Sequence, residues 1–471
     1  MSSQKTTFAL IFSATVIIRI AFYLLSGFTA DDALITFRYA ENIIAGHGFV
    51  YNIGERILGT TTPLFTFLIA LLLAVKLTAH NAALLISLIC SGLTSIILYR
   101  FAQRLRFGKF SLLPVLVYIL WPRSIVADTS GMETALFSLL IIAALYFQFR
   151  KIRIYSLALA TLATLTRPEG ALLLALLFAL NCYEDRRNIS VYFIIPLSIL
   201  IPWLAFSYFY FGSIVPGSIS GKLALYSSIE TRSALEKLVY LLGWHNPLGW
   251  LITLAALFGS WWLLAKQNFG KLEIIWLFLM IAFFTFSNTS LFFWYPVPIY
   301  PVYLLLAAAS LPLLWDKLKI DASYKRLFSI GLPLLISITL LFYGYRQLGY
   351  YQEYENYLTG VHRAIGLYLK SNAEEEDVVA ARYIGNTGYY SNLYILDRDG
   401  LVTPSAAAYN RQGDYLGFIL DNRPDWVVAA PSRITGRFAT DLIFLSNYEL
   451  IETFGSEDRT RHNLYRLKDS E

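Results

Sequence analysis

Apolar runs long enough to cross a membrane recur along the first three quarters of the chain. A hydrocarbon core about 30 Å thick is crossed by about 20 helical residues, and such runs follow one another until about residue 345 of 471. In the whole chain 56% of residues are hydrophobic and only 15% are charged, which departs strongly from the composition of soluble domains. The sequence therefore predicts an all-α polytopic membrane protein.

The balance of charge reverses after residue 345. Residues 1–345 contain 25 Lys and Arg against 14 Asp and Glu, whereas residues 346–471 contain 13 against 18. This shift predicts a transmembrane domain over 1–345 and a soluble domain over 346–471. A helical stretch at 351–369 and β-rich runs at 378–381, 393–396 and 426–429 predict that the soluble domain is a small α/β unit.

Basic residues gather in short loops that predict the topology. These loops are residues 100–109, 150–153, 186–187, 266–271 and 317–326. Placing them all in the cytoplasm explains the basic excess without a nucleic acid and predicts about eleven crossings of a cytoplasmic (inner) membrane. The N-terminus is then cytoplasmic, and both the loop 28–62 and the C-terminal domain lie outside. We expect the run 63–75 to be interfacial or re-entrant because it is short; the alternative is that it spans and reverses the topology.

Two adjacent carboxylates, Asp31 and Asp32, directly follow the first predicted helix. Either could cap an interfacial helix, but capping needs only one of them. A carboxylate pair also suits a general base or a divalent metal such as Mg or Mn. Arg38 lies two helical turns further along the same face and could reach a phosphate; the alternative is an ion pair with Glu41 or Glu55.

The motifs after the first helix resemble a known family. The acidic pair is followed by Arg38–Asn42, Gly46–Gly48 and Asn52–Arg56. This order resembles the first outer loop of polytopic GT-C glycosyltransferases, in particular the branch of mycobacterial terminal arabinofuranosyltransferases, and more distantly protein O-mannosyltransferases and aminoarabinose transferases. Further matches are Ser130–Thr134, Thr166–Gly170, Phe211–Ser218 with Lys222, Trp294–Tyr295 and Asp399–Leu401. The chain has Pro216-Gly217-Ser218 where family members typically have Pro-Asn-Thr, which weakens the assignment of Lys222.

The resemblance implies an inverting transferase that moves a sugar from a polyprenyl-phosphate donor to a glycan, lipid or protein acceptor outside the cytoplasm. It implies that Asp31 is the general base and that Asp32 orients the acceptor or shares a metal. The candidates for binding the donor phosphate are Arg38, Arg167 and Lys222. The candidates for lining the cavity or binding the acceptor are Tyr39, Asp128, Glu133, Glu169, Trp294 and Tyr295. Helix capping is the alternative for Asp128 and Glu133, and an interfacial aromatic belt is the alternative for Trp294 and Tyr295. For Arg167 and Glu169, beside Pro168, the alternative is that they satisfy backbone groups freed at a helical hairpin.

A secondary transporter or flippase of lipid-linked sugars would also have many helices and buried charges. Transporters usually contain two pseudo-repeated halves, and the sequence shows no such repeat. A polysaccharide polymerase or ligase usually relies on a large outer loop late in the chain, and the loop 212–246 is modest. The sequence has no Walker loop, HExxH or CxxC motif, which argues against an ATP-driven machine and a zinc hydrolase.

Overall fold

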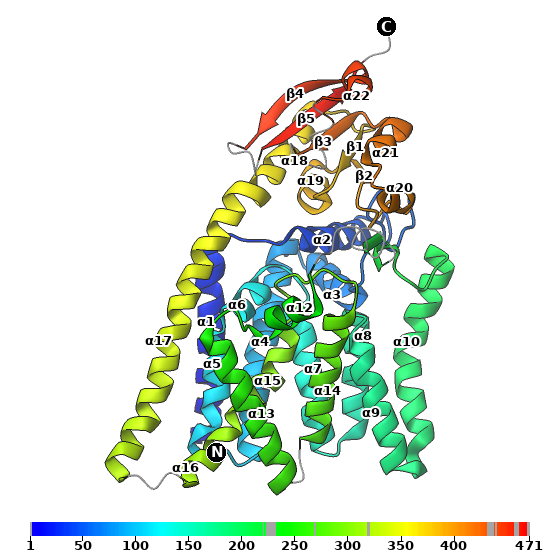
Figure 1. Cartoon of the computed structure of the whole chain (residues 1–471). Coiled ribbons are helices and arrows are strands. Elements are labelled where there is room, and N and C mark those ends of the chain that lie inside the picture. Colours follow the sequence, from blue (N-terminus) through cyan, green and yellow to red (C-terminus); the bar gives the residue numbers. More distant parts are fainter. Residues whose placement is uncertain are drawn as a thin grey trace.

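The protein is a bundle of helices that carries a small α/β domain at one end (Figure 1). The computed structural model describes residues 2–219, 221–222, 232–267, 270–317, 321–430, 438, 440–455 and 461–468. Part of the predicted basic loop 317–326 thus lies outside the described residues. We call the side of the bundle that carries the α/β domain the tail side. Helix α2 (Asp31–Ile44) lies between the bundle and this domain (Figure 1).

The bundle contains helices of very different lengths. They are α1 (Ser2–Ser26), α3 (Pro63–Ala74), α4 (Ala79–Arg104), α5 (Leu113–Leu120), α6 (Pro122–Thr129), α7 (Thr134–Phe149), α8 (Arg153–Thr166), α9 (Gly170–Glu184), α10 (Ile189–Phe211), α12 (Ala234–Leu242), α13 (Pro247–Gln267), α14 (Lys271–Phe286), α15 (Tyr300–Ala308), α16 (Ser310–Lys317) and α17 (Ala322–Tyr354). In the described part of the chain, 5 helices are long and apolar enough to cross a membrane, or up to 6 if the bent pair α5 and α6 forms one span. The chain is an integral membrane protein, as predicted, and α3 is one of its shorter apolar helices.

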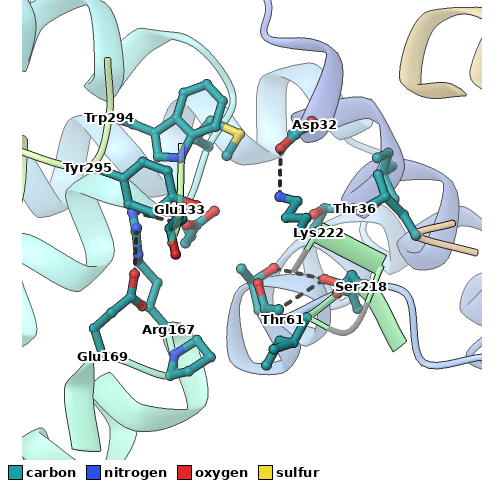
Figure 2. A pocket seen from close by; sticks show the side chains of 18 of the residues that line it. Asp32, Thr36, Thr61, Glu133, Arg167, Glu169, Ser218, Lys222, Trp294 and Tyr295 are labelled. Carbon is teal, nitrogen blue, oxygen red and sulfur yellow. Dashed lines mark hydrogen bonds and ion pairs between the residues drawn. The ribbon is translucent and has the colours of Figure 1, made fainter. Parts of the chain in front are cut away.

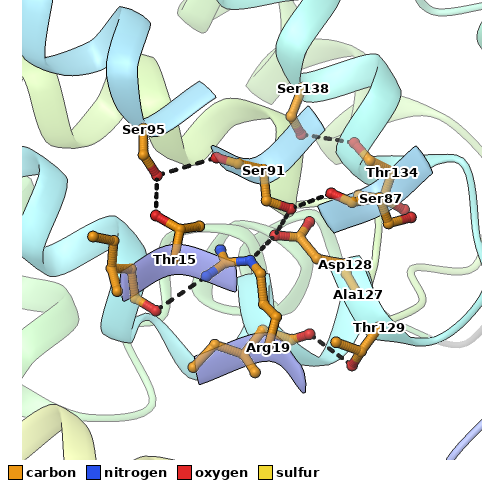
Figure 3. Close-up of polar contacts among 12 residues, drawn as sticks. Thr15, Arg19, Ser87, Ser91, Ser95, Ala127, Asp128, Thr129, Thr134 and Ser138 are labelled. Carbon is orange, nitrogen blue, oxygen red and sulfur yellow. Dashed lines mark hydrogen bonds and ion pairs between the residues drawn. The ribbon is translucent and has the colours of Figure 1, made fainter. Parts of the chain in front are cut away.

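A buried polar network joins three helices inside the bundle (Figure 3). Arg19 of α1 donates through Nε to Asp128 Oδ2 of α6 at 2.8 Å, and both side chains are fully buried. Ser91 of α4 donates to the same carboxylate oxygen at 2.9 Å. Since an unpaired charge inside a membrane protein is costly, this pairing explains how the first helix accommodates Arg19.

The C-terminal domain is built on one mixed sheet. Its strands are β1 (Val378–Ala381), β2 (Tyr394–Asp397), β3 (Trp426–Ala429), β4 (Tyr448–Phe454) and β5 (His462–Leu467), in the order β2-β1-β3-β5-β4. Strand β1 is parallel to β2 and β3, whereas β5 is antiparallel to β3 and β4. The helices of the domain are α18 (Gly360–Asn372), α19 (Ile384–Ser391), α20 (Ala406–Gln412), α21 (Tyr415–Asn422) and α22 (Leu442–Asn447).

The two faces of the sheet pack in two separate cores, as alternation along a strand requires. Ala380 and Val427 pack with α20, α21 and α22. Val379 on the opposite face packs with α18 and α19, and this second core includes Ile35 and Tyr39 of α2. The first loop of the transmembrane region and the C-terminal sheet therefore share one hydrophobic core.

A continuous helical path connects the bundle to the C-terminal domain. Helix α17 leads into a π-helical turn (Glu355–Thr359) and then into α18. The change of composition at residue 345 thus falls inside a helix, and the division into domains at that residue remains a prediction.

Candidate active site

Two cavities on the tail side share a wall that contains Asp32. The first has a volume of about 340 Å³ and the second about 400 Å³. Both are lined by Asp32, Lys222, Trp294 and Leu401. Asp31 lines only the second cavity. The acidic pair therefore lies where the two cavities adjoin.

The first cavity is lined by charged, hydroxyl-bearing and apolar side chains. Figure 2 shows Glu133, Arg167 and Glu169 on one side of it, facing Asp32 and Lys222 on the other. The ion pair between Lys222 Nζ and Asp32 Oδ2 measures 3.4 Å, and both side chains are partly exposed. The apolar wall includes Leu172 of α9 and Phe283 and Phe284 of α14.

A break between two helices positions Arg167. Helix α8 ends at Thr166, Arg167 adopts an extended conformation and Pro168 prevents the helix from continuing. The Arg167 guanidinium lies 3.0 Å from Glu169 Oε1 and 3.6 Å from Glu133 Oε1. Two carboxylates thus compensate one buried cation, as a charge buried in a membrane protein requires.

The turn that carries Glu133 packs closely on α2. Gly131 has a φ of +83°, and a Cβ there would lie 3.0 Å from the side chains of Ala33 and Phe37. Ser130 accepts a backbone hydrogen bond from Ala30 at 2.9 Å. These contacts place Glu133 beside the start of α2, which carries the acidic pair.

Helix α2 forms hydrogen bonds with both ends of α19 in the C-terminal domain. Asp31 Oδ1 accepts hydrogen bonds from the backbone and side-chain N–H groups of Asn386 at 2.7 and 2.9 Å. Its Oδ2 accepts one from the Gly385 N–H at 3.0 Å. Arg38 donates to the carbonyl oxygens of Gly388 and Leu393 at 2.8 and 2.7 Å, at the other end of α19. A carboxylate at the N-terminus and a guanidinium at the C-terminus both match the helix dipole.

Burial raises the pKa of Asp31 from 3.8 to about 6. The hydrogen bonds from Asn386 and Gly385 lower the pKa, and the neighbouring charge of Asp32 raises it. A carboxylate offers about four acceptor lone pairs, and the donors from α19 occupy three of those on Asp31. One lone pair on Oδ2 remains, on a carboxylate whose pKa is close to the range in which a base works best.

Aromatic rings line most of the second cavity, and two charged residues join Asp31, Asp32 and Lys222 in its wall. The rings are those of Phe28, Tyr240, Phe292, Phe293, Trp294, Tyr350, Tyr351, Tyr354 and Tyr383. Arg382 follows β1 and Asp399 follows β2, and Arg382 Nε lies 3.2 Å from Asp399 Oδ2. Ligands of parallel sheets bind beyond the carboxyl ends of the strands. Sequence reasoning missed Arg382, although its position directly after a predicted strand was a usable signal.

Three predicted site residues lie elsewhere. Arg38 does not line either cavity, because it binds carbonyl groups at the C-terminal end of α19 and just beyond it. Tyr39 is fully buried and donates to the Ile57 carbonyl at 2.7 Å, so it shapes the first loop. Asp128 is paired with Arg19 in the buried network of the bundle. Of the other predictions, Asp31 lines the second cavity, and the first is lined by Asp32, Glu133, Arg167, Glu169, Lys222, Trp294 and Tyr295.

A divalent metal does not fit the arrangement of the acidic residues. In the described ranges no three His, Cys, Asp or Glu side chains lie close enough together to hold one ion. Asp32 is already paired with Lys222, and Glu133 and Glu169 are paired with Arg167. We therefore derive no step through a metal.

The fold matches solved membrane proteins over nearly its whole length. ArnT from Cupriavidus metallidurans bound to undecaprenyl phosphate aligns with a TM-score of 0.66 and 14% identity, covering 97% of each chain. The oligosaccharyltransferase of Archaeoglobus fulgidus, in a complex with Zn and sulfate, aligns with a TM-score of 0.60 and 13% identity, covering 94% of this chain and 72% of that one. The protein thus has the GT-C fold that the sequence predicted.

Similarity in sequence is confined to parts of the chain. A terminal β-(1→2)-arabinofuranosyltransferase of Mycobacterium tuberculosis is 33% identical over 116 residues, which are 23% of this chain and 18% of that relative. Residues 345–467 match a family described as a domain of unknown function (DUF8728). The likeness over the whole chain is therefore one of fold, a polytopic GT-C fold, and the match to a family model is confined to the C-terminal region.

Proposed function

We propose that the protein is an inverting glycosyltransferase that moves a sugar from a polyprenyl-phosphate donor to an acceptor hydroxyl outside the cytoplasm. The observation that carries this proposal is the acidic pair at the shared wall of two chemically different cavities. The first cavity combines two cations, Arg167 and Lys222, with an apolar wall, which suits a lipid phosphate. The second combines rings with charged groups, which suits a sugar, because aromatic rings stack on saccharides and charged groups bind hydroxyls.

Lys222 is our first candidate for binding the donor phosphate. Its ammonium lies at the shared wall, opposite the apolar surface of α9 and α14. Arg167 lines the same cavity, but two carboxylates already compensate its charge. We therefore assign direct attraction of the phosphate mainly to Lys222, and to Arg167 the holding of Glu133 and Glu169.

Asp31 is our candidate for the general base. The acceptor oxygen attacks the anomeric carbon and gives its proton to Asp31 Oδ2. The bond from that carbon to the phosphate oxygen breaks, and polyprenyl phosphate leaves with the bonding electrons. Asp31 faces the cavity proposed for the acceptor, and the N-terminus of α19 fixes its orientation. Asp32 then lies between the two substrates beside Lys222.

The ArnT neighbour was solved with undecaprenyl phosphate, and the arabinofuranosyltransferase relative supports the same class of reaction. These similarities support a lipid-linked sugar donor.

The base is tested with Asp31→Asn in proteoliposomes that contain a panel of polyprenyl-phosphate sugars. We expect transfer to fall by about 10²- to 10⁴-fold, the usual contribution of a general base. The matched control is Glu41→Gln, because Glu41 is also on α2 and also contacts α19, through the Tyr389 hydroxyl at 2.7 Å. Thermal unfolding of each variant shows whether the fold is retained. Transfer by folded Asp31→Asn at the level of Glu41→Gln would exclude Asp31 as the base.

The donor site is tested with Lys222→Gln. Losing a charged hydrogen bond costs about 1.5–3 kcal/mol, so we expect KM for the donor to rise about 10- to 100-fold. Lys370→Gln, an exposed position in the last turn of α18, is the control. An unchanged donor KM in Lys222→Gln would reject the phosphate assignment.

A further inference from the structure

An apolar groove lies between helices α5, α13, α15 and α17, and its lining shares no residue with the two cavities of the candidate active site. It has a volume of about 470 Å³. Aliphatic side chains such as Val117, Leu251 and Leu304 form most of its wall. Among the residues that the structure describes, no charged one lines it. A surface of this kind suits hydrocarbon chains.

The groove has the depth of one leaflet. Along α17 it extends from Leu332 to Tyr343. At a rise of about 1.5 Å per residue, this stretch covers about 16 Å, which is about half of a hydrocarbon core of about 30 Å. Acyl chains of a single leaflet would fill this length.

A basic hollow of about 320 Å³ adjoins the tail-side end of the groove. Leu248 and Tyr343 line both spaces. Arg123, His245 and Arg346 line the hollow, and no Asp or Glu of the described ranges does. In the described part of the chain, neither arginine forms an ion pair with a carboxylate.

Arg123 is held in place by neutral groups. It donates to the Tyr240 carbonyl at 2.7 Å and to the Tyr300 hydroxyl at 3.4 Å, and its guanidinium lies 4.3 Å from the centre of the Tyr240 ring. Its positive charge is therefore oriented but not neutralised. Arg346 is exposed at the rim of the same hollow.

We propose that the groove and the hollow together bind one anionic phospholipid of the tail-side leaflet. The acyl chains occupy the groove, and the phosphate lies between Arg123 and Arg346. Arginine is well suited to this role because its planar guanidinium binds phosphate oxygens in pairs. The proposal does not depend on the reaction proposed above. Tyr350 lines both this hollow and the second cavity, so the bound headgroup would lie beside the candidate active site.

Native mass spectrometry of the purified full-length protein tests this site. Phosphatidylglycerol and phosphatidylcholine with identical acyl chains are titrated separately. We expect one phosphatidylglycerol to bind at least about tenfold more tightly than phosphatidylcholine, because both lipids carry the phosphate but only phosphatidylcholine carries a cation that the two arginines repel. Arg346→Gln removes this preference. Arg56→Gln, an exposed tail-side cation that lies over the Tyr210 ring, leaves it intact.

A second variant tests the groove separately. Ala255→Phe fills the space between α13 and α17, so it weakens the binding of both lipids. Equal binding of the two lipids by the native protein would overturn the proposal, as would an unchanged preference in Arg346→Gln. Displacement of bound phosphatidylglycerol by inorganic phosphate would show an anion site without a lipid. Tighter binding of polyprenyl phosphate that is lost in Arg346→Gln would assign the site to a different lipid.

Discussion

Asp31 combines two roles that a single carboxylate rarely serves together. It accepts three hydrogen bonds from the start of α19, and it also lines the second cavity. Burial raises its pKa to about 6. The role as a base needs the ionised form, whereas a protonated carboxyl still accepts hydrogen bonds. Acidification should therefore remove the activity and leave the contact with α19 in place.

We predict that kcat/KM for transfer falls as the pH drops through about 6, by about tenfold per unit below it, because Asp31 becomes protonated. The contribution of Asp31 to folding stability should instead increase as the pH drops. The native state binds more protons than the unfolded state between about pH 4 and 6, so the contribution of Asp31 to stability decreases as the pH rises across that range. Burial raises the pKa of Asp397 to about 7, so the contribution of Asp397 to folding stability also decreases as the pH rises.

Parallel pH profiles of activity and of thermal unfolding check this prediction. Glu41→Gln should keep the acid limb of the wild-type rate profile. An activity that is constant from pH 5 to 8 would contradict the assigned role of Asp31.

At the scale of secondary-structure elements, the contact of α2 with α19 organises the candidate active site. The sequence correctly placed Asp31 and Arg38 on one face of a helix, because seven residues make about two turns. It could not show that this face would be covered by α19, whose residues lie more than 340 positions away. Arg38 was therefore assigned to a phosphate, whereas the structure places it on the carbonyl groups of the C-terminal domain.

The sequence also predicted the strands of the C-terminal domain only in part. The sequence predicted β1 and β3 with their observed bounds and β2 within one residue, because short apolar runs between turn residues are typical of buried strands. It missed β4 and β5. Strand β4 is at the edge of the sheet, and exposed residues such as Glu449 and Leu450 obscure its alternation.

We predict that Gly385→Ala separates α19 from α2. A Cβ at residue 385 would collide with the backbone carbonyl of Asp31, so the chain must move and the three hydrogen bonds weaken. We expect transfer to fall at least about tenfold, since small displacements of catalytic groups are costly. The control is Gly349→Ala, at a helical glycine of α17 where a Cβ meets no atom within 4 Å.

Transfer assays and thermal unfolding of both glycine variants provide the measurement. Gly349→Ala should be neutral or slightly stabilising, because alanine favours the helix by up to about 1 kcal/mol. Wild-type activity in Gly385→Ala would show that the contact does not position Asp31.

The whole molecule behaves as a bundle and a sheet domain joined by a common core. Ile35 and Tyr39 of the first loop pack with Val379 and Ile395 of the sheet. Composition and hydropathy predicted the membrane bundle, and turn and strand patterns predicted a C-terminal α/β unit, because both depend on the local sequence. The shared core depends on contacts between distant segments, which a single sequence does not show.

Removal of the C-terminal domain should expose this core. We predict that a chain ending at residue 354 exchanges the amide hydrogens of α2 at least about tenfold faster than the full chain, since the loop loses its packing partners. The helix α7, which does not contact the sheet core, should exchange at the same rate in both. Hydrogen exchange read by mass spectrometry measures this difference, and unchanged protection of α2 would contradict the shared core.

Binding of the donor lipid tests the two-cavity arrangement. An experimental structure of the full chain with bound polyprenyl phosphate would locate the phosphate directly. We expect it in the first cavity, within hydrogen-bonding distance of Lys222 Nζ, with Asp31 Oδ2 open to the second cavity. A phosphate bound away from Lys222, or an acidic pair closed off from both cavities, would contradict the proposed site.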